Sequence, residues 1–265
     1  MKIATYGKGG IGKSTITSNL SATMANLGLK VFQVGCDPKS DSIKSLVHED
    51  NYKTILEVFR YIPNIDLIKK EDIIYEGYNG IDCCECGGPE PGTGCAGRGI
   101  IKAFEILNKI VDINSYDIVN YDVLGDVVCG GFSIPLKLGY AENVVLIISG
   151  ELMSIYAANN IMRAIENFHK SSDVKLAGII LNCRNVPQEL ELAEKFCFLT
   201  NCILLGVIPR SNSIFKSDYA NKLAVNEDPK VRVIFENIAH KILESKTTLP
   251  EPLSQSRLKE FMKLI

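Results

Sequence analysis

The sequence predicts an α/β fold in which a mostly parallel β-sheet is covered by helices on both faces. Short, nearly continuous apolar segments alternate along the chain with longer segments of helical periodicity. Strands that are buried on both faces have this uninterrupted apolar character. The first apolar segment also runs directly into a glycine-rich loop that opens a helix. Because ligands bind at the carboxyl ends of the strands in such sheets, we expect the functional residues there.

The expected elements follow from the same pattern. Strands are expected over residues 2–6, 30–34, 118–121, 143–148, 176–181 and 203–208. Helices are expected over residues 13–27, 54–61, 99–111, 155–169, 187–198 and 231–243. The sequence contains no internal repeat, low-complexity tract or Pro/Ser-rich linker, so a single domain is expected over residues 1–265.

The composition narrows the class of protein. The chain has 265 residues, of which 46% are hydrophobic and 23% charged, as in a soluble globular protein with a full core. The net charge of −2 gives no reason to expect nucleic acid or an anionic membrane as a partner. The first strand and loop leave no room for a signal peptide, and no apolar run approaches the ~20 residues of a membrane span. We therefore expect a cytoplasmic protein.

The glycine-rich loop, GKGGIGKS, fits the phosphate-loop pattern G-x-x-x-x-G-K-S/T between a strand and a helix. Its backbone N–H groups would surround phosphates, Lys13 would reach the β- and γ-phosphates, and Ser14 would offer its hydroxyl to Mg²⁺. A simple glycine-rich turn is the alternative, but the flanking elements favour a P-loop NTPase fold. The expected nucleotide-binding residues of the loop are Gly7, Lys8, Gly9, Gly10, Ile11, Gly12, Lys13, Ser14 and Thr15.

The loop carries a second lysine, Lys8, near its beginning. This GKGGxGK variant resembles the deviant Walker A motif of the family that includes the iron proteins and the ParA/MinD ATPases. In that family the early lysine reaches the nucleotide of a partner subunit, so the resemblance implies a dimer with ATP between its subunits. The alternative is a solvated surface lysine.

Carboxylates follow two further strands. Asp37 and Asp41 come after the second expected strand, and Asp122 and Asp126 after the third. Such groups orient an attacking water or hold the Mg²⁺ shell, and Asp122 lies where a Walker B carboxylate belongs. Each alone could cap a helix or a turn, but their position beside a phosphate loop favours function. The expected catalytic residues are Lys8, Asp37, Lys39, Asp41, Asp122 and Asp126.

The nine cysteines are not expected to form disulfides in a reducing compartment. Cys95 and Cys129 lie in glycine-rich loops, where backbone amides can stabilise a thiolate or sulfide. A 4Fe-4S cluster needs four thiolates, so a two-fold dimer would supply two from each chain. Cys129 follows Asp126 by three positions, and movement on loss of the γ-phosphate would therefore pull on this cysteine.

Several longer motifs carry a resemblance to a known family. GKGGIGKS, GCDPKSDS, GGPEPGTGCAGRG, YDVLGDVVCGGF, SGELMSIYAANNI and NCRN occur in order over roughly the first 185 residues. In sequence and spacing these motifs resemble the nitrogenase iron-protein family. The resemblance implies a homodimer that bridges one 4Fe-4S cluster through Cys95 and Cys129 and binds MgATP or MgADP.

The same resemblance implies further roles. Asn182 would lie near the adenine, with Pro209 and Arg210 as further nucleotide contacts, and Arg98 on the face that docks to the electron acceptor. That acceptor would be a dinitrogenase-like heterotetramer, and the electron donor a ferredoxin or flavodoxin. In some iron proteins an arginine at the position of Arg98 is also a target of ADP-ribosylation.

Two other functions stay open on the sequence. Dark-operative chlorophyll-pathway reductases share the architecture, but their cluster loop typically reads GCGGY where this chain has GCAGRG. Arg98 therefore favours the nitrogenase side without excluding a reductase that acts on a nickel tetrapyrrole of the coenzyme F430 pathway. A ParA/MinD-type positioning ATPase would instead use the apolar stripe of residues 254–265 at a membrane, although such a stripe also suits ordinary packing.

Two departures from the family pattern stand out. The run Cys83-Cys84-Glu85-Cys86 is richer in sulfur than usual. It suggests either buried thiols, a second redox function, or a cluster held within one chain together with Cys95 and Cys129; iron content of about four or about eight per dimer would discriminate the bridging and one-per-chain clusters. Ser211 stands where the family commonly has an aspartate, and residues 245–265 match the family weakly.

Overall fold

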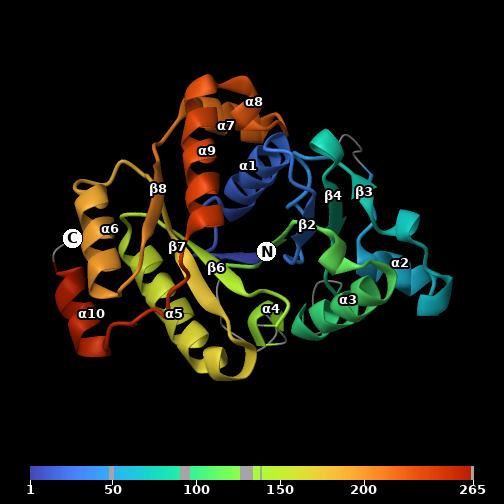
Figure 1. Cartoon of the computed structure of the whole chain (residues 1–265), viewed down its shortest axis with the longest axis horizontal. Coiled ribbons are helices and arrows are strands. Elements are labelled where there is room, and N and C mark those ends of the chain that lie inside the picture. Colours follow the sequence, from blue (N-terminus) through green and yellow to red (C-terminus); the bar gives the residue numbers. More distant parts are fainter. Residues whose placement is uncertain (48–50, 90–95, 126–133, 138, 264–265) are drawn as a thin grey trace.

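The computed structural model describes residues 1–47, 51–89, 96–125, 134–137 and 139–263. An eight-stranded sheet runs through the molecule in the order β3-β4-β2-β5-β1-β6-β7-β8 (Figure 1). Among the strands of the described residues, every pairing is parallel except that of β3 with β4. The strands are β1 (Lys2–Tyr6), β2 (Val31–Gly35), β3 (Tyr75–Glu76), β4 (Asp82–Glu85), β5 (Ile118–Asp122), β6 (Asn143–Ile148), β7 (Lys175–Asn182) and β8 (Leu204–Ile208).

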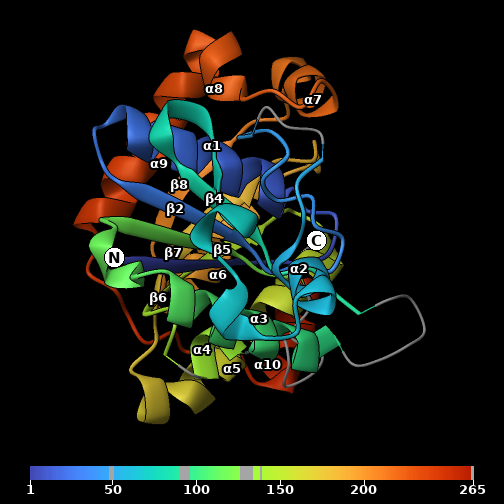
Figure 2. The same cartoon turned by 90° about the vertical axis from the view of Figure 1, so that its right-hand side faces the viewer.

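Helices connect the strands and cover both faces of the sheet (Figures 1 and 2). They are α1 (Lys13–Asn26), α2 (Ile55–Tyr61), α3 (Ala96–Ile110), α4 (Ile134–Lys137), α5 (Leu152–Ser172), α6 (Glu189–Leu199), α7 (Asn212–Tyr219), α8 (Ala224–Glu227), α9 (Pro229–Glu244) and α10 (Gln255–Met262). Short 3-10 turns lie at Ile65–Leu67, Lys70–Asp72, Tyr78–Gly80 and Ile113–Ser115.

Each face of the sheet has its own core. On one face, residues of α2, α3, α5, α6 and α10 pack against alternate strand residues such as Val34 and Val144. On the other, α1, α8 and α9 pack against the intervening residues, such as Val31 and Val145. Successive strand residues point to opposite faces, so strands buried on both sides must be apolar throughout. The expected α/β class, P-loop architecture and helices on both faces are thereby confirmed.

The expected elements lie within a few residues of those in the structure. The first strand and the strand at 143–148 coincide with the expectation, while α5 extends beyond the expected 155–169 at both ends. Elements missing from the expectation are β3, β4, α4, α7, α8 and α10. The β4 sequence, DCCE, begins and ends on an acidic residue, so it lacks the apolar run that marks the other strands.

The last helix, α10, packs against the body of the protein. Leu258 and Phe261 are 4% and 3% exposed, and the Phe261 ring lies 5.7 Å from that of Phe196 on α6. Part of the apolar stripe that a membrane would need is thus buried in the core, as the packing interpretation predicts. Within the described part of the chain, no helix is both long enough and apolar enough to cross a membrane.

Candidate functional site

The phosphate loop joins β1 to α1 at the carboxyl edge of the sheet. At two positions of this loop, Gly7 and Gly12, the surrounding structure leaves no room for a side chain. A Cβ on Gly7 would lie 2.5 Å from the carbonyl oxygen of Ile147, and one on Gly12 would lie 2.9 Å from the Asn182 amide. Gly12 also has φ +95°, in the left-handed region that side chains disfavour. The loop can therefore pack against β6 and β7 only with glycine at these positions.

Lys13 and Ser14 open α1 behind this loop. Lys13 is only 8% exposed, and its Nζ donates a hydrogen bond of 3.3 Å to the Lys8 carbonyl oxygen. Ser14 hydrogen-bonds the Asp122 carboxyl group at the end of β5. A cation, a hydroxyl and a carboxylate thus meet where the loop turns into the helix.

Asp122 is fully buried between these groups. Burial raises its pKa from the ordinary 3.8 to about 6, although hydrogen bonds from Ser14 and Ser42 and the Lys13 charge oppose this shift. Its Oδ2 atom has no hydrogen-bond partner among the residues that the structure describes. An unpartnered buried carboxylate oxygen beside a serine hydroxyl is the donor set that Mg²⁺ prefers, so these residues fit a magnesium ion.

The segment after β2, residues 36–43, lies against the end of β5. The Cys36 N–H donates to the Asp122 carbonyl oxygen at 2.9 Å. Asp37 is half-buried, and its carboxylate accepts a 2.9 Å hydrogen bond from the exposed Lys39 backbone N–H. Asp41 is also half-buried, and its charge contributes to the raised pKa of Asp122. The structure therefore brings Asp37, Asp41 and Asp122 to one edge, as the sequence predicts.

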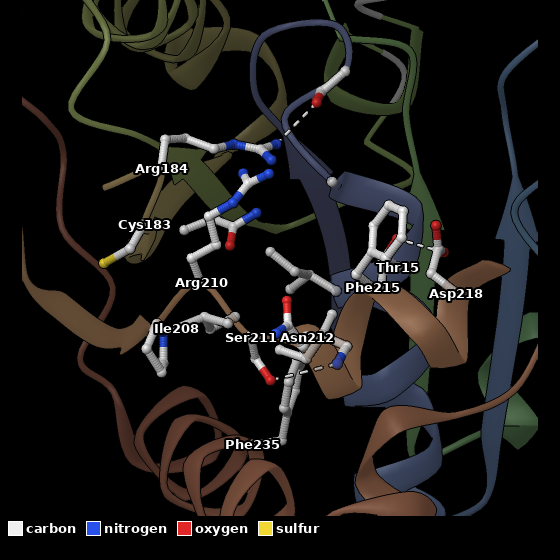
Figure 3. Close-up of a pocket in the computed structure, with 16 residues that line it drawn as sticks. Thr15, Cys183, Arg184, Ile208, Arg210, Ser211, Asn212, Phe215, Asp218 and Phe235 are labelled. Carbon is white, nitrogen blue, oxygen red and sulfur yellow. Dashed lines mark hydrogen bonds between the residues drawn. The ribbon is translucent and has the colours of Figure 1, made fainter. Parts of the chain in front are cut away.

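A pocket of about 420 Å³ opens beside the phosphate loop (Figure 3). It lies between the loop, the ends of β7 and β8, α7 and α9. Its lining comprises Gly10, Gly12, Thr15, Ile16, Asn182, Cys183, Arg184, Ile208, Pro209, Arg210, Ser211, Asn212, Ile214, Phe215, Asp218 and Phe235. The expected nucleotide contacts Asn182, Pro209 and Arg210 are all among these residues.

Hydrogen bonds tie the walls of this pocket to the loop. The Asn182 amide donates to the Ile11 carbonyl oxygen at 2.7 Å, and Arg184 donates to that of Gly10 at 3.0 Å. On the opposite side the Thr15 hydroxyl donates to Asp218 at 2.8 Å (Figure 3). A phosphate loop that continues into a pocket with amide, guanidinium and aromatic groups can hold the phosphates and the base of one nucleotide.

Lys8 lies at the open side of the loop. Its side chain is 36% exposed, and its Nζ is 3.8 Å from a carboxylate oxygen of Glu151, which is 48% exposed. Both residues line a second hollow of about 550 Å³ together with Arg184 and Arg210. An ion pair this exposed contributes little stability, so Lys8 can exchange Glu151 for another anion.

Other expected site residues lie elsewhere. Arg98 is exposed in the first turn of α3. Cys95, Asp126 and Cys129 lie outside the described residues, so their roles stay predictions. The sequence analysis did not single out Glu151, Arg184, Phe215 or Asp218, which the structure adds to the site. Glu151 and Arg184 lie in the motifs SGELMSIYAANNI and NCRN, but without an assigned role, whereas Phe215 and Asp218 lie in no motif that the sequence analysis named. The contacts of these residues join segments far apart in the chain.

The sulfur-rich run occupies β4 and the residue after it. Cys83, Cys84 and Cys86 are each 0% exposed, and burial raises the pKa values of the Cys83 and Cys84 thiols. Cys83 packs in the core on the α1 side, whereas Cys84 and Cys86 pack in the core on the α3 side. Cys83 and Cys86 therefore point to opposite faces of the sheet, an arrangement that suits buried thiols rather than a chelating pair.

Comparison with known proteins identifies the family. The model of the 4Fe-4S iron sulfur cluster binding proteins, NifH/frxC family, matches residues 1–265. This chain belongs to that family. It is 44% identical, over its whole length and 96% of the relative's, to a nitrogenase iron protein of Methanococcus voltae. It is 42% identical to nitrogenase iron protein 2 of Paenibacillus durus, over 98% of this chain and 90% of the relative.

Solved structures with the same fold lie further away in sequence. The septum site-determining protein MinD of Pyrococcus horikoshii OT3, complexed with Mg-ADP, superposes with a TM-score of 0.70 at 22% identity, over 92% of this chain and 97% of that one. At this identity the match shows the P-loop fold alone. The NifH/frxC assignment confirms the family expected from the sequence and, with it, the class of ATP-hydrolysing oxidoreductases.

Proposed function

We propose that this NifH/frxC protein is an ATP-dependent electron donor of the nitrogenase iron-protein type. Two copies form a homodimer that bridges one 4Fe-4S cluster and couples MgATP hydrolysis to the transfer of one electron. The observation that carries the proposal is the family match over residues 1–265, in a chain whose phosphate loop, buried Asp122 and base-sized pocket adjoin one another. The cytoplasm is the proposed compartment.

The nucleotide lies with its phosphates on residues 7–14 and its adenine in the pocket that Asn182 and Pro209 line. The loop N–H groups and the Lys13 ammonium neutralise phosphate charge, while Ser14 and Asp122 hold Mg²⁺. Phe215 is 68% exposed at this pocket, so its ring is available to stack on the base.

The second subunit completes the site through Lys8. Its ion pair with Glu151 is half-exposed and easily exchanged, and the lysine moves to the phosphates bound by the partner subunit. ATP binding thus favours a closed dimer, and loss of the γ-phosphate favours an open one. Two segments respond to the loss of the γ-phosphate. They are residues 36–43, through Asp37 and Asp41, and residues 122–129, through Asp122.

Cys95 and Cys129 would hold the cluster, each subunit supplying two thiolates. The cluster, when bound, would supply a one-electron carrier. Arg98 is exposed in the first turn of α3, three positions after Cys95, and belongs to the face that meets the acceptor. The proposed acceptor is a dinitrogenase-like heterotetramer, and the proposed donor is a ferredoxin or flavodoxin.

The test is electron delivery to a purified dinitrogenase. The cluster-loaded dimer, given a low-potential reductant, is expected to support acetylene reduction only when MgATP is present. Acetylene reduction without MgATP would contradict the ATP coupling. No product under any condition would overturn dinitrogenase as the acceptor and favour a nickel-tetrapyrrole reductase, to be tested with that partner.

A further inference from the structure

Glu85 is a fully buried carboxyl group that the proposed mechanism has not yet used. It ends β4 and is 0% exposed. In the sheet register it is the neighbour of Gly35 on β2, which is in turn the neighbour of Asp122 on β5. Because paired residues of parallel strands point to the same face, Glu85 and Asp122 flank Gly35 on the side that α1 covers.

The carboxyl group lies directly over Gly35. A Cβ on Gly35 would be 1.9 Å from the Glu85 Oε2 atom and 2.7 Å from Oε1. No other residue can therefore replace this glycine without displacing the carboxyl group. Because Gly35, the last residue of β2, has no side chain, the Glu85 carboxyl group can reach the segment that follows β2.

That segment binds the carboxyl group through its backbone. The Ile43 N–H donates a 3.0 Å hydrogen bond to Glu85 Oε1, and the Ser42 backbone also hydrogen-bonds this carboxyl. Ser42 in turn hydrogen-bonds Asp122 and accepts from the buried Gln33 amide through its hydroxyl and carbonyl oxygens. Glu85 therefore holds one end of the segment that carries Asp37 and Asp41.

The other side of Glu85 leads towards a proposed cluster ligand. The Cys86 N–H donates to the Gly35 carbonyl oxygen at 2.8 Å. Gly88 lies so close to Pro38 that an added Cβ would be 2.6 Å from the proline ring. Residues 85–88 thus contact residues 35–43 at both ends, and Cys95 follows ten positions after Glu85 in the sequence.

We propose that Glu85 is a positioning residue that links the nucleotide site to the strand leading to Cys95. When Asp37 and Asp41 respond to the γ-phosphate, the carboxyl group passes the displacement of Ser42 and Ile43 to residues 85–88. This route is separate from the one through Asp126 and Cys129. The effect of this route on the cluster rests on the proposed function, whereas the contacts of Glu85 are independent of it.

The chemistry of the carboxyl group suits a fixed connector. Burial and the neighbouring Asp122 charge raise the pKa of Glu85, which favours the neutral acid. Its Oε2 atom has no partner within the described ranges, so the one group that must be retained is the Oε1 acceptor. A glutamine keeps this acceptor and the shape of the side chain, whereas a methionine keeps only the volume.

The experiment compares Glu85→Met, Glu85→Asp and Glu85→Gln in the cluster-loaded dimer. In Glu85→Asp the side chain is one methylene shorter, so the carboxyl oxygen no longer reaches the Ile43 N–H. This variant also removes the hydrogen bond if the Glu85→Met protein does not assemble. Cys84→Ala is the matched control, because Cys84 is equally buried on the same strand but faces the other core. Hydrogen exchange of the Ile43 amide and the shift in the cluster reduction potential on addition of MgATP are measured for each.

Loss of one buried hydrogen bond is expected to speed Ile43 exchange about tenfold in the Met and Asp variants. The MgATP-induced potential shift is expected to fall to less than half in both. The Gln variant and Cys84→Ala are expected to retain wild-type exchange and a wild-type shift. A full potential shift in Glu85→Met or Glu85→Asp would overturn the proposal.

Failure of the proposed function would look different. In that case the wild-type protein itself would show no cluster or no MgATP-induced shift, and the coupling role of Glu85 would fall with it. The measurement of Ile43 hydrogen exchange needs neither a bound cluster nor an MgATP-induced potential shift. Unchanged Ile43 exchange in Glu85→Met would therefore overturn the positioning role whatever the wild-type potential does.

Discussion

Thr15 donates a 2.8 Å hydrogen bond to Asp218, a residue 203 positions further along the chain. Thr15 lies in the first turn of α1, directly behind the phosphate loop, and Asp218 lies on α7, which walls the pocket. The bond thus fixes the distance between the part of the site for phosphates and the part for the base.

Thr15→Val is expected to weaken ATP binding roughly tenfold, because it removes the hydroxyl that holds α7 and leaves Asp218 without this donor. Thr15→Ser keeps the hydroxyl and is expected to bind ATP within about twofold of wild type. Calorimetric titration with MgATP measures both. Equal affinities for the Val and Ser variants would refute the role of this bond.

Phe215 offers a test of where the base lies. If its exposed ring stacks on adenine, Phe215→Ala should weaken ATP binding about tenfold and leave tripolyphosphate binding unchanged. Phe198→Ala is the matched control, since Phe198 on α6 is 84% exposed and outside the pocket lining. Equal losses for ATP and tripolyphosphate would place the base elsewhere.

Local and non-local features of this site differ in how far the sequence predicts them. The phosphate loop is contiguous, so its residues and its place between β1 and α1 could be predicted. The helix α7 was missed, because its short sequence NSIFKSDY mixes polar and apolar residues without a clear helical stripe. The bond from Thr15 to Asp218 forms only when α1, which follows the central strand β1, and α7, which follows the edge strand β8, are brought together by the fold.

Glu85 shows a second limit of the sequence. A glutamate among cysteines suggests a polar or metal-binding loop, since charged side chains are rarely buried completely. The structure instead places it in a strand, where the absent side chain of Gly35 makes room. Such a fit depends on the pairing of β2 with β4, which no periodicity in either segment specifies.

The raised pKa of Asp122 predicts a stability change with pH in the nucleotide-free protein. Its pKa of about 6, against an ordinary 3.8, means that the folded state binds the proton more tightly. The corresponding stability is present at low pH and is lost as pH rises through about 6. Between pH 5 and 7 the free energy of unfolding should fall by about 1 kcal/mol from this group.

Asp122→Asn is expected to remove this contribution, because the amide does not titrate. The measurement is urea unfolding of wild type and variant at pH 5, 6 and 7 without nucleotide or Mg²⁺. The difference in stability between variant and wild type should grow in the variant's favour as pH rises. A difference that stays constant with pH would contradict the buried, shifted carboxyl.

The cysteines separate into two groups by their expected effect on iron content. Cys95→Ser and Cys129→Ser are each expected to abolish the cluster while the fold is retained, since each removes two of four thiolates from a dimer. Cys86→Ala is expected to keep about four irons per dimer, because Cys86 is buried in the core. Iron analysis and circular dichroism measure both properties. About eight irons in the wild-type dimer would instead support one cluster per chain.

The central claim is that ATP controls the release of an electron from this protein to a partner. Its most direct test is rapid mixing of the reduced, cluster-loaded dimer with oxidised dinitrogenase while cluster absorbance is followed. We predict oxidation of one electron per dimer with MgATP and no oxidation over the same time with MgADP or without nucleotide. Oxidation at the same rate with and without MgATP would contradict the claim.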